Sequence, residues 1–224
     1  IGFNTVRVFS HDLAWEADPE GFKERVGKFL DVCEKHHIRV IFTFFTNGCY
    51  GFEGEARLGK QPEPVPGVHN SGWVQSPGCT SVNDPAKWGR LEKYVKDVIT
   101  TFRDDERILL WDLYNEPGNP KRGCKSLPLL RKVFEWARAI NPSQPLTSCL
   151  EWRTPEEMQR FLLDNCDVIT FHSYAGPKTL SAKWLGLAKE HDRPVLCTEY
   201  MARTRGSTFQ AILPIFHRER IGAI

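Results

Sequence analysis

Two apolar segments of this chain each lead to a glutamate, and these glutamates are the residues best placed to do chemistry. The segment 107–114 runs into Asn115 and Glu116, and the segment 194–200 contains Glu199 near its end. When two carboxyl groups face one cavity, one can protonate a leaving oxygen while the other attacks carbon or activates water. Cleavage of a glycosidic bond requires this division of labour, so these two residues are the candidate catalytic pair.

Each glutamate also has a simpler interpretation as a structural residue. A single glutamate at the end of a strand is more often a helix cap or an ion-pair partner than a catalyst. Two such glutamates favour the catalytic interpretation only if the fold brings both of them to the same edge of the sheet or barrel. The interpretation therefore depends on the elements that carry them.

Short apolar runs alternate with amphipathic segments of helical period along the whole chain. The runs predicted as strands are 4–9, 38–45, 107–114, 145–150, 167–172 and 194–200, and a further run begins at Ile221. They are almost continuously apolar and rich in β-branched and aromatic residues, which is typical of strands buried on both faces of a parallel sheet. Strict alternation of this kind predicts an α/β fold with right-handed crossovers.

Helix-start signals precede three of the amphipathic segments. Asp18 and Asp84 each stand directly before a proline, an order typical of a capped helix start. Thr154 is followed three residues later by Glu157, which predicts a capping box. We therefore expect a helix to begin close behind each of these residues.

Polar residues at the strand ends favour a closed barrel over an open sheet. Most of the predicted strands end on such residues, among them Ser10, Asp12, Thr46, Asn47, Asn115, Glu116, Glu151, His172, Tyr174 and Glu199. A barrel collects all strand ends around one mouth, whereas an open sheet gathers only those beside its switch point. No GxGxxG or Walker sequence follows the first strand, which disfavours nucleotide binding.

At this point the residues resemble a known group of enzymes. The run Trp111-Asp112-Leu113-Tyr114-Asn115-Glu116-Pro117, together with Glu199, resembles the retaining glycoside hydrolases of clan A, the cellulase and mannanase type related to family 5. In that clan an Asn-Glu-Pro ends strand four and supplies the acid/base, and a glutamate ending strand seven is the nucleophile. Counting 4–9 as strand two places Glu116 on strand four and Glu199 on strand seven. The resemblance implies an incomplete (β/α)8 TIM barrel, with strands two to seven and the start of strand eight.

The resemblance also implies roles for residues around the pair. Arg7 would lie under the nucleophile, Tyr174 would hydrogen-bond it, and Asn115 would bind the sugar 2-hydroxyl. His172 and Trp152 are further candidates for substrate contact. Each has a structural alternative: His172 as a core histidine, Trp152 as a packing residue, and Arg7 as the partner of a buried carboxylate.

The proposed roles carry electrostatic expectations. Glu199 should be ionised, because Arg7 and Tyr174 would both favour its charged form. Burial and the neighbouring carboxylate should instead raise the pKa of Glu116. We expect the two carboxyl groups to be ~5 Å apart, as in retaining enzymes.

Residues 1–224 are predicted to be a single partial TIM-barrel catalytic domain that cleaves β-linked bonds in plant-type polysaccharides or oligosaccharides. The alternative is a catalytically impaired barrel fragment that at most binds carbohydrate, since strand one and most of strand eight are lacking relative to the clan.

A Schiff-base aldolase would need a strand-end lysine, and no predicted strand has one. Open barrel edges would expose unpaired backbone, so we expect a homodimer or oligomer.

The composition of the chain limits the kinds of partner that it can bind. The 224 residues are 41% hydrophobic with a formal net charge of +2, which allows a domain-sized core and offers no electrostatic surface for nucleic acid. Charged residues interrupt every long apolar run, so no membrane span is predicted. We predict a carbohydrate substrate and no cofactor, and no metal because His11 and His69 lack ligand spacing. No targeting segment is visible, and we expect the parent protein to be secreted or periplasmic.

The long segment 47–83 is rich in Gly and Pro, and a loop of that length is usually functional. Its aromatic residues Tyr50, Phe52 and Trp73 are candidates to stack on sugars, with packing as the simpler interpretation of each. The loop cysteines could pair or bind metal, but free thiols are the simpler interpretation of all three, Cys49, Cys79 and Cys124. We assign Cys33, Cys149 and Cys197 to the core.

Overall fold

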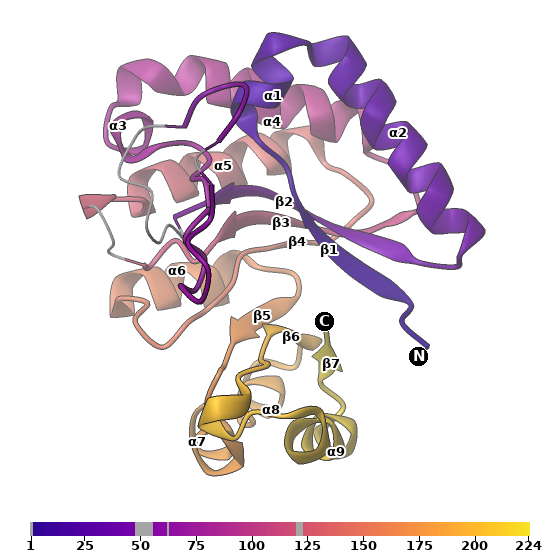
Figure 1. Ribbon diagram of the computed structural model, residues 1–224, viewed down its shortest axis with the longest axis vertical. Coiled ribbons are helices and arrows are strands. Elements are labelled where there is room, and N and C mark those ends of the chain that lie inside the picture. Colours follow the sequence, from indigo (N-terminus) through magenta and orange to yellow (C-terminus); the bar gives the residue numbers. More distant parts are fainter. Residues whose placement is uncertain (1, 48–55, 62, 120–122) are drawn as a thin grey trace.

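Parallel strands in two sheets form the centre of the molecule (Figure 1). The computed structural model describes residues 2–47, 56–61, 63–119 and 123–224. The first sheet has the order β1 (Thr5–Phe9), β2 (Arg39–Thr46), β3 (Ile108–Asn115), β4 (Leu146–Thr147). The second has the order β5 (Ile169–His172), β6 (Val195–Glu199), β7 (Gly222–Ala223). All pairings between these strands are parallel, and an isolated parallel bridge from Leu150 to Phe171 joins the sheets.

Helices follow the strands in the predicted alternation. The α-helices are α1 (Asp12–Ala17), α2 (Pro19–Lys35), α3 (Cys79–Val82), α4 (Trp88–Phe102), α5 (Leu127–Ile140), α6 (Glu156–Asn165), α7 (Pro177–Lys183), α8 (Leu187–His191) and α9 (Phe209–Glu219). Two short 3-10 helices, Pro85–Lys87 and Arg203–Arg205, complete the elements of the described residues. In Figure 1, α2, α4 and α5 lie along one face of the first sheet, and α7 and α9 lie beside the second. None of the described helices is long and apolar enough to cross a membrane.

Burial explains why the central strands are so apolar. All residues of β2 after the first are buried, and β3 is buried except at Leu109. Trp111 of β3 is fully buried, with its ring centroid 5.6 Å from that of Phe44. Tyr94 of α4 packs on the same Phe44 ring at 5.3 Å. Aromatic packing between the sheet and α4 thus fixes the strands whose ends carry the polar residues.

All three predicted helix starts are confirmed, but the capping box predicted at one of them is wrong. Asp18 caps α2, accepting a hydrogen bond from the Gly21 N–H at 3.0 Å. Asp84 caps the 3-10 turn that precedes α4. The capping box is wrong, because Pro155 is the N-cap of α6 and Thr154 turns back to accept from the Glu151 N–H at 2.9 Å. The threonine hydroxyl is therefore used by the loop rather than by the helix.

A disulfide between Cys79 and Cys124 corrects the free-thiol interpretation of these two residues. Their Cα atoms are 4.9 Å apart, and the bond ties α3 to the segment that follows β3. Cys49 lies outside the described residues. Cys33, Cys149 and Cys197 are free and buried, as predicted.

Candidate functional site

The two predicted catalytic glutamates lie close together at the ends of two strands, although these strands are not adjacent in the sheet order. Glu116 follows the last residue of β3, Glu199 ends β6, and His172 ends β5 between them. One donor atom from each of these three side chains lies within 4.8 Å of the others. The glutamate side chains keep 18% and 26% of their surface exposed, whereas that of His172 keeps only 2%. The fold therefore brings the predicted pair to one accessible rim.

Arg7 of β1 connects three strands beneath this rim. Its Nη1 donates to Glu199 Oε1 at 2.7 Å, and its Nε and Nη2 donate to Asp112 Oδ2 at 2.9 and 2.6 Å. Burial would lower the pKa of Arg7, but Asp112 and Glu199 outweigh that effect and raise it. The guanidinium therefore stays charged and neutralises the carboxylates around it.

Asp112 is a site residue that the sequence analysis did not single out. Its side chain is 1% exposed, and it accepts from both Arg7 and the Thr43 hydroxyl, the latter at 3.3 Å. The available signal was a carboxylate inside an apolar strand, since a buried Arg7 required such a partner. Asp112 supplies the structural counter-ion, which leaves Glu199 as the more exposed partner of Arg7.

Tyr174 and Asn115 complete the surroundings of the glutamates. The Tyr174 hydroxyl donates to Glu199 Oε2. Burial, then the charge and hydrogen bond of Glu199, raise the pKa of Tyr174, so its hydroxyl keeps its proton. Asn115 Oδ1 accepts from Arg7 at 2.6 Å and its Nδ2 donates to Thr46 Oγ1 at 3.0 Å. These contacts hold Asn115 and Glu199 in fixed orientations.

His172 lies between the two glutamates. Its Nδ1 is 2.9 Å from Glu116 Oε1, and its Nε2 is 3.6 Å from Glu199 Oε1 without a hydrogen-bond partner. Burial lowers the pKa of His172, but Cys149 and the two glutamates together raise it well above its usual value. The imidazole is therefore a cation whose Nδ1–H donates to Glu116.

The pKa of Glu116 is lowered, which contradicts the predicted rise. Burial does raise it, as expected, but the hydrogen bond and charge of His172 outweigh burial, and Asn119 and Arg7 add to the effect. Asn119 Nδ2 donates to Glu116 Oε2 at 3.1 Å. The sequence did not show that His172 and Asn119 would both point at this carboxylate, and that is why the prediction failed.

The aromatic candidates are divided between two parts of the rim. Trp152 is 66% exposed beyond β4, and the Arg153 guanidinium carbon lies 4.5 Å from the centroid of its ring. Trp73 packs edge-on against Phe9 at 4.8 Å, and Phe9 lies 4.7 Å from the Arg7 guanidinium. Tyr50 and Phe52 lie outside the described residues.

Among the described residues, Glu116, His172 and Glu199 form the group whose donor atoms come closest to a metal-ligand set. Glu199 already accepts from Arg7 and Tyr174, and His172 Nδ1 is held by Glu116. The positively charged Arg7 and His172 side chains beside these carboxylates would repel an approaching metal cation. The arrangement is better suited to proton transfer and nucleophilic attack than to metal binding.

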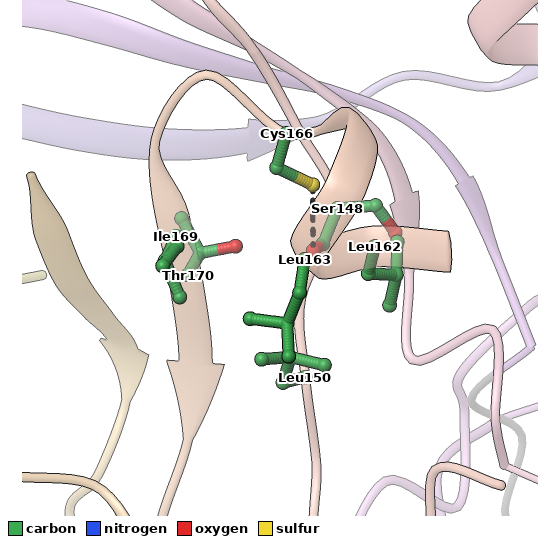
Figure 2. Close-up of a pocket in the computed structure, with 7 residues that line it drawn as sticks. All are labelled: Ser148, Leu150, Leu162, Leu163, Cys166, Ile169 and Thr170. Carbon is green, nitrogen blue, oxygen red and sulfur yellow. Dashed lines mark hydrogen bonds between the residues drawn. The ribbon is translucent and has the colours of Figure 1, made fainter. Parts of the chain in front are cut away.

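A separate small space lies between the segment after β4, the end of α6 and β5 (Figure 2). Its lining is apolar apart from Cys166 and the hydroxyl residues Ser148 and Thr170, and the Cys166 thiol donates to the Ser148 carbonyl at 3.7 Å. No carboxylate lines it, so it offers no acid–base chemistry.

Comparison with known proteins identifies the fold. No protein-family model and no curated protein matches this sequence. Among solved structures, an exo-β-1,4-mannosidase from an Opitutaceae bacterium matches with a TM-score of 0.67 and 18% identity, over 99% of this chain and 45% of that one. Cel5A of Thermotoga maritima matches with a TM-score of 0.61 and 16% identity, over 99% and 75%. A β-mannanase of the blue mussel Mytilus edulis matches with a TM-score of 0.63 and 11% identity, over 98% and 74%.

The comparisons confirm the predicted architecture. The chain has the fold of cellulase- and mannanase-type glycoside hydrolases over nearly its whole length, as an incomplete TIM barrel. It spans less than half the length of the bacterial mannosidase.

Proposed function

We propose that this chain carries the catalytic centre of a retaining β-glycoside hydrolase. The observation that carries the proposal is the approach of Glu116 and Glu199 at one rim, with an oxygen of each within 4.8 Å of the other. Carboxyl groups ~5–5.5 Å apart are typical of retaining enzymes, whereas inverting enzymes keep them ~6.5–9.5 Å apart to admit a water molecule. The close approach therefore favours double displacement.

Glu199 is the proposed nucleophile. Arg7 and Tyr174 each donate to one of its oxygens, which holds the carboxylate in place and stabilises its negative charge. Attack on the anomeric carbon breaks the glycosidic bond and forms a glycosyl ester on Glu199. Water then hydrolyses this ester and restores the free carboxylate.

Glu116 is the proposed acid/base, and it acts as a pair with His172. Because the pKa of Glu116 is lowered and that of His172 raised, the proton of the resting pair is on the imidazole. The 2.9 Å hydrogen bond between Nδ1 and Oε1 lets this proton reach Glu116 as the leaving oxygen develops charge. In the second step Glu116 removes a proton from the attacking water.

Plant-type β-linked polysaccharides and their oligosaccharides are the proposed substrates. The structural neighbours include an exo-β-1,4-mannosidase, a β-mannanase, and Cel5A in complex with cellobiose as substrate. β-Linked mannosides and glucosides are therefore the first substrates to test, and the activity of any longer protein that contains this chain is part of the same proposal.

The test is hydrolysis of aryl β-mannosides and β-glucosides by the purified chain. We expect the wild-type chain to turn over substrate and Glu199→Ala to abolish this activity. Glu20→Ala, a change at an exposed glutamate of α2, is the control and should leave the activity intact. The alternative function is an impaired barrel that only binds carbohydrate. Binding of oligosaccharide without turnover would establish that alternative and overturn the proposal.

A further inference from the structure

Cys149 contacts the proposed acid/base from behind. It lies on the segment between β4 and α6 and is completely buried. Its Sγ accepts a hydrogen bond from the backbone N–H of Glu116 at 3.0 Å and lies 4.0 Å from Asn115 Oδ1. One thiol therefore contacts both residues of the Asn-Glu pair.

The backbone of Glu116 needs such a contact. Its φ is +48°, in the left-handed region that side-chain-bearing residues rarely adopt. Conformations of this kind persist when the surrounding structure holds them. Glu116 lies beyond the last residue of β3, and the Cys149 sulfur provides the acceptor for its backbone N–H.

The turn that follows Glu116 is held against the same segment. A Cβ added to Gly118 would lie 2.7 Å from the Thr154 Cα, so the two backbones are in close contact there. Asn119 N–H donates to the Glu116 carbonyl at 3.0 Å and closes the turn. Sulfur contact at one end and backbone contact at the other fix the turn to the segment 149–154.

We infer that Cys149 is a positioning residue whose thiol holds the Glu116 backbone so that its carboxyl group faces the bond to be cleaved. The inference rests on the proposed function, since it assigns Glu116 the acid role. Burial raises the pKa of Cys149, which keeps it a neutral thiol that can accept from the Glu116 N–H and donate toward Asn115. A thiolate could only accept.

The test compares Cys149→Ala and Cys149→Ser with Cys33→Ala, a control that removes the same atoms from a buried site on α2. Each variant is assayed on a β-linked oligosaccharide, whose leaving group needs protonation, and on a dinitrophenyl β-glycoside, whose leaving group does not. We expect Cys149→Ala to slow kcat on the oligosaccharide by about tenfold or more, since small displacements of a catalytic group are costly. The first turnover of the dinitrophenyl substrate should change little.

Serine keeps a donor and an acceptor, so Cys149→Ser should recover part of the oligosaccharide rate. Cys33→Ala should leave the ratio of the two rates unchanged. Equal losses on both substrates in Cys149→Ala, or a ratio identical to that of Cys33→Ala, would overturn the inference.

If the proposed function itself is wrong, the assays give a result that differs from the one that overturns the role of Cys149. A wild-type chain that cleaves neither substrate overturns that function whatever the variants do. The positioning contact is then decided by the Glu116 amide resonance and its hydrogen exchange. Cys149→Ala should shift the resonance and speed exchange while Cys33→Ala does neither, and an unchanged amide in Cys149→Ala would overturn the contact itself.

Discussion

Arg7 is the residue on which the charge balance of the site depends. It donates to Asp112, which is 1% exposed, and to Glu199, which is partly exposed. Taking the cation away would leave Asp112 as an uncompensated buried charge. The same cation holds the proposed nucleophile, so stability and activity both depend on it.

We therefore expect Arg7→Ala to lower the free energy of unfolding by about 3–5 kcal/mol, the usual cost of breaking a buried ion pair. Chemical denaturation measures this. Arg25→Ala is the control, because Arg25 and Asp18 are both more than half exposed and such pairs contribute ~1 kcal/mol or less. Equal effects of the two changes would contradict the account.

The Glu116–His172 pair predicts a stability maximum in mildly acidic solution. The raised pKa of His172 stabilises the fold below pH 6.5, and that contribution is lost as the pH rises through the folded-state pKa. The lowered pKa of Glu116 stabilises the fold above pH 4.5, and that contribution is lost as the pH falls through the folded-state pKa. Both contributions are complete between these two values.

Denaturation of wild type, His172→Gln and Glu116→Gln across this pH range tests the pair. The difference between wild type and His172→Gln should shrink at alkaline pH, and the difference between wild type and Glu116→Gln should shrink at acidic pH. Differences that do not vary with pH would show that the two groups are not coupled as described.

The residue types at the site were predictable from the sequence, but their charge states were not. The Asn115–Glu116 step and Glu199 followed apolar strands, and Arg7 in an apolar strand implied a carboxylate partner. The direction of the Glu116 pKa shift depends on side chains that approach from β5 and from the turn after β3, and strand patterns do not reveal such contacts.

At the scale of elements, the strands were predictable where burial is continuous. β2 and β3 begin and end within one residue of the predicted bounds, because both are buried on two faces. β4 is only two residues long, although residues 145–150 were predicted, since Ser148 turns to donate to the Tyr114 carbonyl at 2.6 Å. Local hydrogen bonds of Ser148 and Thr154 to the backbone therefore outweigh the sequence patterns that predicted a longer strand and a capping box.

The Cys79–Cys124 disulfide was not predictable either, because the approach of α3 to the segment after β3 depends on the whole fold. It closes a separation of 45 residues and ties α3 to the segment after β3. Asn83 strengthens the same connection by donating to the Gly123 carbonyl at 3.1 Å and accepting from the Lys125 N–H at 2.8 Å.

Replacing both cysteines by serine should therefore lower the free energy of unfolding by about 2–4 kcal/mol, chiefly by releasing a constraint on the unfolded chain. A thermal melt with and without a dithiol reductant measures the effect. The reductant should lower the Tm of wild type and leave that of the double variant unchanged. A reductant-insensitive wild type would contradict the disulfide.

At the scale of the whole molecule, the strand order is that of a barrel with open edges. In the described part of the chain, β1 pairs only with β2 and β7 only with β6. Unpaired strand edges favour association with another chain. We expect the isolated chain to form a dimer or a larger oligomer, with a mass in light scattering of at least about twice 25.7 kDa. A monodisperse monomer would contradict this expectation.

The central claim is that Glu199 attacks sugar, and trapping the glycosyl ester tests it most directly. The chain is incubated with dinitrophenyl β-mannosides and β-glucosides that carry fluorine in place of the 2-hydroxyl, which slows release of the ester. Mass spectrometry of the intact chain and its peptides should show one added sugar on Glu199, and none in Glu199→Ala. Turnover of the unmodified glycosides without an adduct, or an adduct on another residue, would contradict the account.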